Sequence, residues 1–240
     1  MHTTTCTPAQ LLAQLHTAFA QKADPLIAVQ QQRYMKSTMA YWGIKKPVID
    51  QICRELFAQA KPVDNAQYVE TLEYLFTHAT KREEWYAAIV YARKFSTFII
   101  PQNVPVYMQL VLRGQWWDIV DDVSVNLIGK ALCTATDMST LVRAWIVHDN
   151  MWVRRTALLV QLKYKQKTDF ELLTHLIATV AHEKEFFIRK AIGWVLREYS
   201  KTNPEVVYAY VTLQRSTLSP LSVREGLRCI PIQESNSTFS

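Results

Sequence analysis

Several features that mark common enzyme classes are missing from this chain. It has only 5 glycines among 240 residues, which is few for a glycine-rich α/β enzyme or a turn-rich β protein and favours helices. The chain contains no P-loop and no GxGxxG, GxSxG or HExxH sequence, and its 6 histidines pair with no cysteine or serine at a telling spacing. Nucleophilic triads and metal-dependent hydrolysis are therefore disfavoured.

The cysteines and the hydrophobic runs exclude further classes of protein. No cysteine stands in a CxxC pair or at the Cys/His spacing of a zinc site, so we expect neither a metal site nor a disulfide scaffold. The four are Cys6, Cys53, Cys133 and Cys229. The N-terminus lacks a signal-peptide pattern, and no apolar run approaches the ~20 residues that span a bilayer. We expect a reduced, cytoplasmic protein without a membrane partner.

Charge and hydrophobicity limit what remains. The chain is 49% hydrophobic, which is enough for a sizeable core, and its formal net charge is +6. The excess of lysine and arginine is spread over both halves without a basic tail, so any basic patch must be made by folding. A basic protein of this size suits a polyanion such as nucleic acid, although mild basicity is weak evidence by itself.

Helical periodicity dominates the segments between the prolines. Asn203-Pro204 and Ser219-Pro220 each place an N-cap residue before a proline, which is typical of helix starts. No convincing alternating strand is present. We expect an all-α fold with helices near residues 8–21, 25–36, 47–60, 66–77, 81–96, 104–113, 117–132, 137–146, 151–163, 169–181, 186–199, 204–213 and 220–229.

A loose repeat runs through the second half of the chain. Helices about 32–36 residues apart begin with an aromatic residue or valine. These residues are Trp85, Trp117, Trp152, Phe187 and Val223. The period indicates an α-solenoid, a superhelix of HEAT-like or armadillo-type helix pairs, and we expect its concave face to be basic. We assign residues 1–232 to this one domain and 233–240 to a disordered C-terminal tail.

A solenoid with a basic concave face suits a DNA duplex as its ligand. The repeat architecture alone favours the alternative, a generic helical scaffold for a protein partner. Residues that break the local helical pattern could decide between DNA and a protein as the partner.

The densest group of aromatic and acidic residues runs from Trp116 to Asp122. Asp118 would lie in the first turn of a helix, where a carboxylate stabilises the helix dipole. Asp122 would lie away from the core as a solvated or paired charge. Asp121 shares a face with Trp117, too deep in the helix for a cap and too close to tryptophan for free solvation. Of the three carboxylates, Asp121 is the best candidate for chemistry.

Arg155 stands on an apolar stripe with Trp152, while the neighbouring Arg154 points about 100° away. An arginine among apolar side chains needs an anion. Two interpretations stay open at this point. One is a structural salt bridge, for example to Asp121 or Asp122, and the other is the binding of a phosphate beside the aromatic surface.

Trp194 shares a helical stripe with Phe187, either as core packing or as part of a site. Basic residues follow consecutive repeats, and on a curved solenoid several could align along a phosphate backbone. They are Lys163, Lys165, Lys167, Arg189, Lys190, Arg197, Lys201, Arg224 and Arg228. The first candidates for DNA contacts are Lys163, Arg189 and Lys190.

The residue patterns resemble the AlkD-like DNA alkylation-repair glycosylases, a family of HEAT-like repeat proteins, over nearly the whole chain. The matching runs are Arg33–Lys36 with Gly43-Ile44, Trp116–Asp121, Asp149–Ala157 and Lys184–Tyr199. The last two runs are long and specific, so chance similarity is improbable.

The resemblance implies excision of positively charged N3- and N7-alkylpurines, such as 3-methyladenine and 7-methylguanine, without a base-recognition pocket. It implies that Trp117 and Trp194 flank the deoxyribose of the lesion. It further implies that Asp121 is the catalytic carboxylate and that Arg155 binds backbone phosphate. Tyr34 matches an aromatic residue near the same cleft.

This chemistry is physically coherent, because a cationic alkylpurine already leaves readily and positive charge develops on the sugar. A carboxylate and tryptophan faces would stabilise that charge. We therefore expect a metal-independent DNA glycosylase of base excision repair, without a cofactor, acting as a monomer on duplex DNA that contains alkylated purines. The alternative is a non-catalytic binder of DNA structures on the same fold.

Overall fold

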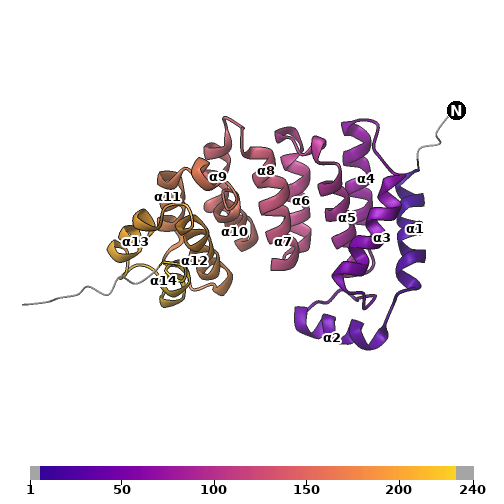
Figure 1. Cartoon of the computed structure of the whole chain (residues 1–240), viewed down its shortest axis with the longest axis horizontal. Coiled ribbons are helices and arrows are strands. Elements are labelled where there is room, and N and C mark those ends of the chain that lie inside the picture. Colours follow the sequence, from indigo (N-terminus) through magenta and orange to yellow (C-terminus); the bar gives the residue numbers. More distant parts are fainter. Residues whose placement is uncertain (1–5, 231–240) are drawn as a thin grey trace, which may run out of the picture. The chain divides into compact units, whose positions relative to one another are not determined.

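The structure, a computed structural model, describes residues 6–230 and is built from helices (Figure 1). The chain divides into two compact units, the first ending at Ala131 and the second beginning at Leu132. The predicted disordered tail, residues 233–240, lies outside the described residues. The assignment of residues 1–232 to one domain stays a prediction.

The first unit consists of helices joined by short connections. They are α1 (Pro8–Ala20), α2 (Pro25–Met35), α3 (Lys46–Ala58), α4 (Asn65–Thr77), α5 (Arg82–Lys94), α6 (Val104–Gly114) and α7 (Trp117–Val123), with 3-10 turns η1 (Ser96–Phe98) and η2 (Pro101–Asn103). α7 continues into a π-helical segment, η3 (Ser124–Ile128), and α8 (Gly129–Leu132) spans the boundary between the units. Within the unit, α5 packs against α3, α4 and α7, and α6 packs against α7.

Capping residues explain where several helices begin. The Asp24 side chain accepts the backbone N–H of Leu26 at 2.9 Å, and the Asp64 side chain accepts that of Gln67 at 2.8 Å. Such caps satisfy amide groups that the first helical turn leaves without a partner. In α1 and α2 a proline follows the cap, where its missing N–H costs nothing.

The core of the first unit is rich in buried tyrosine. Tyr68, Tyr91 and Tyr107 are at most 1% exposed. The rings of Tyr68 and Tyr91 stack with centroids 5.8 Å apart, and the hydroxyl groups of Tyr68 and Tyr107 lie 3.0 Å apart. Because these two hydroxyls satisfy each other, the unit buries aromatic area without leaving the groups unpaired.

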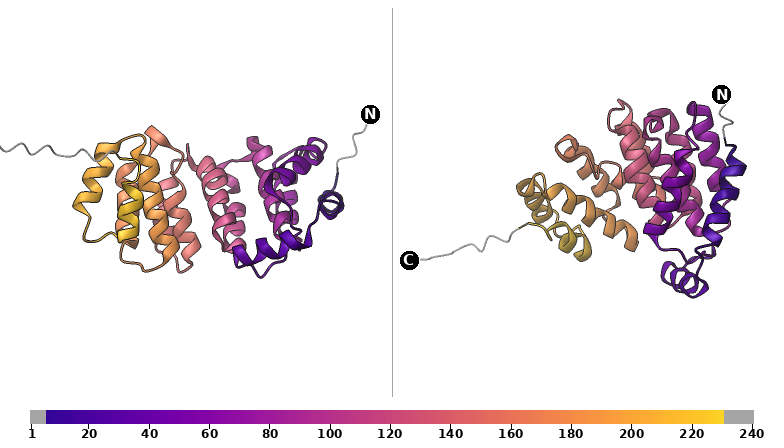
Figure 2. Two further views of the ribbon diagram at one scale, coloured as in Figure 1. Left: turned by 60° about the horizontal axis from the view of Figure 1, so that its bottom comes forward. Right: turned by 45° about the vertical axis from the view of Figure 1, so that its right-hand side comes forward.

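The second unit consists of α9 (Met138–Ile146), α10 (Met151–Leu159), α11 (Phe170–Val180), α12 (Phe186–Ser200), α13 (Pro204–Leu213) and α14 (Pro220–Gly226), with a 3-10 turn, η4 (Lys165–Lys167). α12 contacts α10, α13 and α14, and these helices lie side by side in Figure 2. Gly193 makes the close approach of α14 possible, because a Cβ atom there would lie 2.5 Å from the Cβ of Glu225. α12 is therefore the central helix of this unit.

The prediction of an all-α fold is confirmed, and consecutive helices pack in pairs within each unit, as expected of an α-solenoid. In the described part of the chain, the only β-pairing is an isolated bridge between Ala40 and Lys81. The predicted basic concave face depends on how the units are arranged and stays a prediction. No helix within residues 6–230 combines the length and apolar character needed to cross a membrane.

Two predicted helices are wrong in detail. The segment 117–132 is not a uniform α-helix, because η3 interrupts it. The predicted helix 151–163 ends as an α-helix at Leu159, and turns follow it. The hydrophobic pattern continues through both points, so periodicity alone did not reveal the change of backbone geometry.

Candidate active site

α7 carries the two residues that the sequence singled out most sharply. Trp117 begins the helix and Asp121 follows one turn later, so both lie on one face and both are half-buried. The opposite face anchors the helix, since Ile119 is fully buried. Gly114 permits this packing, because a Cβ atom there would lie 2.4 Å from the Ile119 side chain. Local sequence thus presents Trp117 and Asp121 together on an anchored helix.

The helical register changes soon after Asp121. The α-helical part ends at Val123 and the π-helical segment η3 begins at Ser124. π-helical turns are rare and frequently occur at functional sites, where the extra residue re-aims the side chains that follow. This geometry marks the neighbourhood of Asp121 as specialised.

Asp118 forms a buried ion pair that the sequence did not reveal. Its carboxylate accepts two hydrogen bonds from the Arg82 guanidinium, at 2.6 and 3.0 Å, and one from the Tyr86 hydroxyl at 2.6 Å. The side chains of Asp118 and Arg82 are only 8% and 6% exposed. Asp118 does lie in the first turn of α7, but its main partner is a cation of another helix rather than the helix dipole.

The phenol of Tyr86 stays protonated in this environment. Burial first, and then the negative charge of Asp118, raise the pKa of Tyr86 far above its usual value. The hydroxyl is therefore protonated at neutral pH and donates its hydrogen bond to the carboxylate.

Asp122 lies near the surface and is paired. This is one of the two possibilities predicted for it, a solvated or a paired charge. It lies 3.2 Å from the Arg93 guanidinium and accepts a hydrogen bond from the Asn126 side chain at 2.6 Å. Both Asp118 and Asp122 are therefore engaged with a cation within the first unit.

Tyr34 lies on α2 and is 77% exposed. The connection after α2 returns to the start of the helix, where the Asp24 N–H donates to the Trp42 carbonyl at 3.0 Å. Gly43 allows the close approach, since it adopts a φ of 84° and a Cβ atom there would lie 2.0 Å from the Asp24 oxygen. Tyr34 is thus displayed on a helix whose attachment depends on the adjoining loop.

Arg155 is buried in the second unit, with 3% exposure, in agreement with its place on an apolar stripe. Its guanidinium donates to the Phe187 carbonyl and lies over the Phe187 ring, 5.8 Å from the centroid. Trp152 packs against the same ring at 4.9 Å. Phosphate binding and a salt bridge to Asp121 both stay predictions, while Asp122 has Arg93 as a partner.

The neighbouring Arg154 has a partner that was not anticipated. Its guanidinium donates to both carboxylate oxygens of Glu183, at 2.8 and 2.9 Å, and also to the carbonyls of His148 and Asp149. It thereby joins α10 to the segment between α11 and α12, and it is a structural rather than a solvated arginine.

The remaining candidates for DNA contacts belong to the second unit as well. Trp194 is half-buried on α12 and Lys163 is exposed. Arg189 donates to the Glu183 carbonyl at 2.9 Å, and Lys190 lies 2.9 Å from the Glu225 carboxylate. The structure thus groups Trp117, Asp121 and Tyr34 in the first unit and Arg155, Trp194, Lys163, Arg189 and Lys190 in the second.

Glu225 is the shared anion that holds Lys190 on α12. It accepts from Lys190 at 2.9 Å and from Arg197 at 2.7 Å. The hydrogen bond from Lys190 lowers the pKa of Glu225 below its ordinary 4.5, burial opposes this, and the positive charges of Lys190, Arg197 and Arg228 reinforce it. A carboxylate with a lowered folded-state pKa stabilises the fold above its unfolded pKa, and this stability is lost as pH falls through the folded value.

We therefore expect Glu225→Gln to reduce the free energy of unfolding by about 1–3 kcal/mol at pH 7. The difference from wild type should shrink as pH falls below 4.5 and through the lowered pKa, at which the carboxyl of folded wild type also takes up a proton. Urea unfolding of wild type and variant at pH 7 and at pH 3.5 measures the difference in unfolding free energy at each pH. Glu198→Gln, which removes an exposed pair with Lys201, is the control. A difference that does not depend on pH would contradict the assignment.

Three consecutive buried charges at the start of α5 were missed from the sequence. Arg82, Glu83 and Glu84 are 5%, 0% and 0% exposed. Acidic residues in a first helical turn are ordinary in sequence, because they complement the helix dipole. A buried acidic residue in a first turn has the same local pattern as an exposed one, so only the packing of the unit shows that these three charges are buried.

Within residues 6–230, no group of three or more His, Cys, Asp or Glu residues is arranged to hold a metal ion.

Comparison with known proteins finds matches that cover most of the chain. A family model described as "DNA alkylation repair enzyme" matches residues 15–230. A solved structure described as "Predicted DNA alkylation repair enzyme from Enterococcus faecalis" is similar, with a TM-score of 0.77 and 32% sequence identity. The match covers 88% of this chain and 98% of that chain. No curated protein matches.

Proposed function

Because this chain belongs to the family of DNA alkylation repair enzymes, we propose that it is a DNA glycosylase of base excision repair. It would hydrolyse the N-glycosidic bond of positively charged N3- and N7-alkylpurines in duplex DNA. The family supports a role in the repair of alkylated DNA. The bond that is cleaved and the class of lesion are our proposal.

The observation that carries the proposal is the placement of Asp121 one helical turn after Trp117 on α7. Asp121 is half-buried on the face that it shares with Trp117. A carboxylate beside an aromatic surface is what a reaction with a cationic transition state requires.

The proposed reaction needs little more than Asp121 and Trp117. An alkylated purine already carries a positive charge and leaves as a neutral base, so no acid is required to protonate it. As the bond breaks, positive charge develops on the sugar, as in glycoside hydrolysis. Asp121 would stabilise that charge and orient the attacking water, and Trp117 would contribute through its ring face. A neutral purine lacks the activated leaving group, which accounts for selectivity.

The second unit would bind the DNA around the lesion. Trp194 would lie against the deoxyribose, and Arg155 would bind a backbone phosphate. Lys163, Arg189 and Lys190 would add phosphate contacts, so we expect the affinity for duplex DNA to fall steeply with salt.

Base release from a defined lesion tests the proposal. The chain is incubated with duplex DNA containing one N7-methylguanine, and the released base is measured by chromatography against the spontaneous release without protein. We expect release from the lesion and none from the matching undamaged duplex. Tight, salt-sensitive binding without release would overturn the proposal and favour a non-catalytic binder of DNA structures.

A further inference from the structure

The first turn of α5 is an unusual place for buried charge. Arg82, Glu83 and Glu84 follow one another, and each is at most 5% exposed. Charged side chains are seldom buried unless they are paired, and their partners indicate what they hold in place. Their partners lie in two other parts of the first unit, α7 for Arg82 and the loop between α2 and α3 for Glu83 and Glu84.

Arg82 holds α7. Together with the Tyr86 hydroxyl it occupies both carboxylate oxygens of Asp118, at 2.6–3.0 Å. Asp118 directly follows Trp117 and precedes Asp121 by three residues. Because a two-pronged guanidinium contact fixes orientation as well as distance, it fixes the direction in which the face of α7 with these two residues points.

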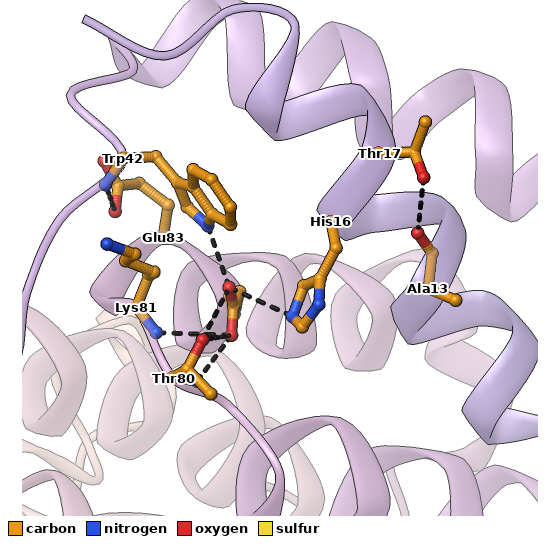
Figure 3. Close-up of polar contacts among 8 residues, drawn as sticks. Ala13, His16, Thr17, Trp42, Thr80, Lys81 and Glu83 are labelled. Atoms are coloured by element: carbon orange, nitrogen blue, oxygen red, sulfur yellow. Dashed lines mark hydrogen bonds and ion pairs between the residues drawn. The ribbon is translucent and has the colours of Figure 1, made fainter. Parts of the chain in front are cut away.

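Glu83 and Glu84 hold the loop between α2 and α3. Glu83 accepts the backbone N–H groups of Trp42, Gly43 and Ile44 at 2.9–3.1 Å. Glu84 accepts the indole N–H of Trp42 at 2.8 Å and lies 3.1 Å from His16 of α1 (Figure 3). The loop that attaches α2, and with it Tyr34, is therefore fastened to the same turn of α5.

A tyrosine pair joins the two sets of contacts. The hydroxyl of Tyr41, in the loop, lies 3.3 Å from the hydroxyl of Tyr86, which itself donates to Asp118. The hydrogen bonds thus run without interruption from the loop, through α5, to α7. We name the four residues Arg82, Tyr86, Asp118 and Tyr41 the Asp118 network.

We propose that Arg82, Tyr86 and Asp118 are positioning residues, which hold the first turn of α7 so that Trp117 and Asp121 meet the sugar in a productive geometry. Tyr41 ties the same network to the loop that carries α2. This inference rests on the proposed glycosylase function. None of the four residues needs to touch DNA.

Asp118 lies in the first turn of α7, between Trp117 and Asp121. The end of a helix is where fraying begins, so a side-chain contact in the first turn holds the part of α7 that its own hydrogen bonds hold least. A displacement of about 1 Å in a reacting group can cost about 100-fold in rate. A fixed first turn therefore has a direct consequence for chemistry at Asp121.

Two conservative variants and a matched control test the proposal. Asp118→Asn keeps the size of the side chain and removes the charge that Arg82 binds, whereas Tyr86→Phe removes one hydroxyl and leaves the ion pair. Asp122→Asn removes a second, more exposed ion pair of α7, the one with Arg93. Each variant is mixed in excess with duplex containing N7-methylguanine, and base release is followed in a single turnover.

We expect the rate constant of release to fall about 10- to 100-fold in Asp118→Asn and about 3- to 10-fold in Tyr86→Phe. The affinity for undamaged duplex should change less than about two-fold, because the side chains of Arg82 and Asp118 are at most 8% exposed and bind each other. Because the protein is in excess over the duplex, a partial loss of folded protein leaves the rate constant unchanged as long as the folded fraction still saturates the DNA. An unchanged rate constant in Asp118→Asn, or an equal fall in Asp122→Asn, would overturn the proposal.

Hydrogen exchange separates this inference from the proposed function. We expect the amides of residues 120–123 to exchange faster in Tyr86→Phe than in wild type or Asp122→Asn. If wild type releases no base, the glycosylase proposal fails, and faster exchange still supports the structural half of the inference. If wild type releases no base and the exchange is also unchanged, the positioning role is overturned too.

Discussion

Asp121→Asn is expected to abolish measurable base release. The amide keeps the size of the side chain but removes the negative charge that, in the proposed reaction, would face the developing cation on the sugar. We expect the single-turnover rate constant for an N7-methylguanine duplex to fall at least about 100-fold, which corresponds to about 2.7 kcal/mol of lost transition-state stabilisation. The measurement is chromatography of the free base, corrected for spontaneous depurination.

The control lies one residue further along the same helix. Asp122→Asn changes an equivalent carboxylate that is paired with Arg93, and we expect release within about two-fold of wild type. Affinity for undamaged duplex should remain similar in both variants. Undiminished release by Asp121→Asn would mean that another group stabilises the sugar cation.

Glu83→Ala is expected to have the largest effect on stability. The substitution removes the common acceptor of three backbone N–H groups, those of Trp42, Gly43 and Ile44, from a site that is 0% exposed. Donors left buried without a partner cost about 1–3 kcal/mol each before water enters. Allowing for such relaxation, we expect a loss of about 3–5 kcal/mol in the free energy of unfolding, measured by urea denaturation.

A surface glutamate provides the comparison. Glu70 on α4 is exposed, and Glu70→Ala should change the free energy of unfolding by no more than about 0.5 kcal/mol. The loss of unfolding free energy in Glu83→Gln should lie between those of Glu83→Ala and Glu70→Ala. The amide oxygen of glutamine still accepts hydrogen bonds, whereas its NH₂ group faces other donors. A loss in Glu83→Ala as small as that of Glu70→Ala would show that water replaces the carboxylate at little cost.

The helices themselves follow from local information. Asn203-Pro204 and Ser219-Pro220 do begin α13 and α14, because a cap and a fixed proline φ act within a few residues. The placing of Trp117 and Asp121 on one face is equally local, since it needs only a helical repeat of 3.6 residues. The buried position of Arg155 followed from the same reasoning.

Ion-pair partners that are distant in the sequence could not be predicted from local patterns. The partner of Asp118 is Arg82, 36 residues earlier, and that of Arg154 is Glu183, 29 residues later. A charged residue has the same local pattern whether it ends in water or against an opposite charge. The attribution of Asp118 to the helix dipole was incomplete for this reason.

By itself, then, the sequence determined the all-α class, the approximate positions of the helices and the placing of one carboxylate and one tryptophan on the same helix face. Hydrophobic periodicity and capping act over a single helical turn, so these features need no knowledge of the rest of the molecule. Only the tertiary structure decided that Asp118 and Asp122 are held by Arg82 and Arg93, and that Arg82, Glu83 and Glu84 are buried. The physical reason is that burial and ion pairing are properties of what packs against a residue, and packing joins segments that local sequence does not connect.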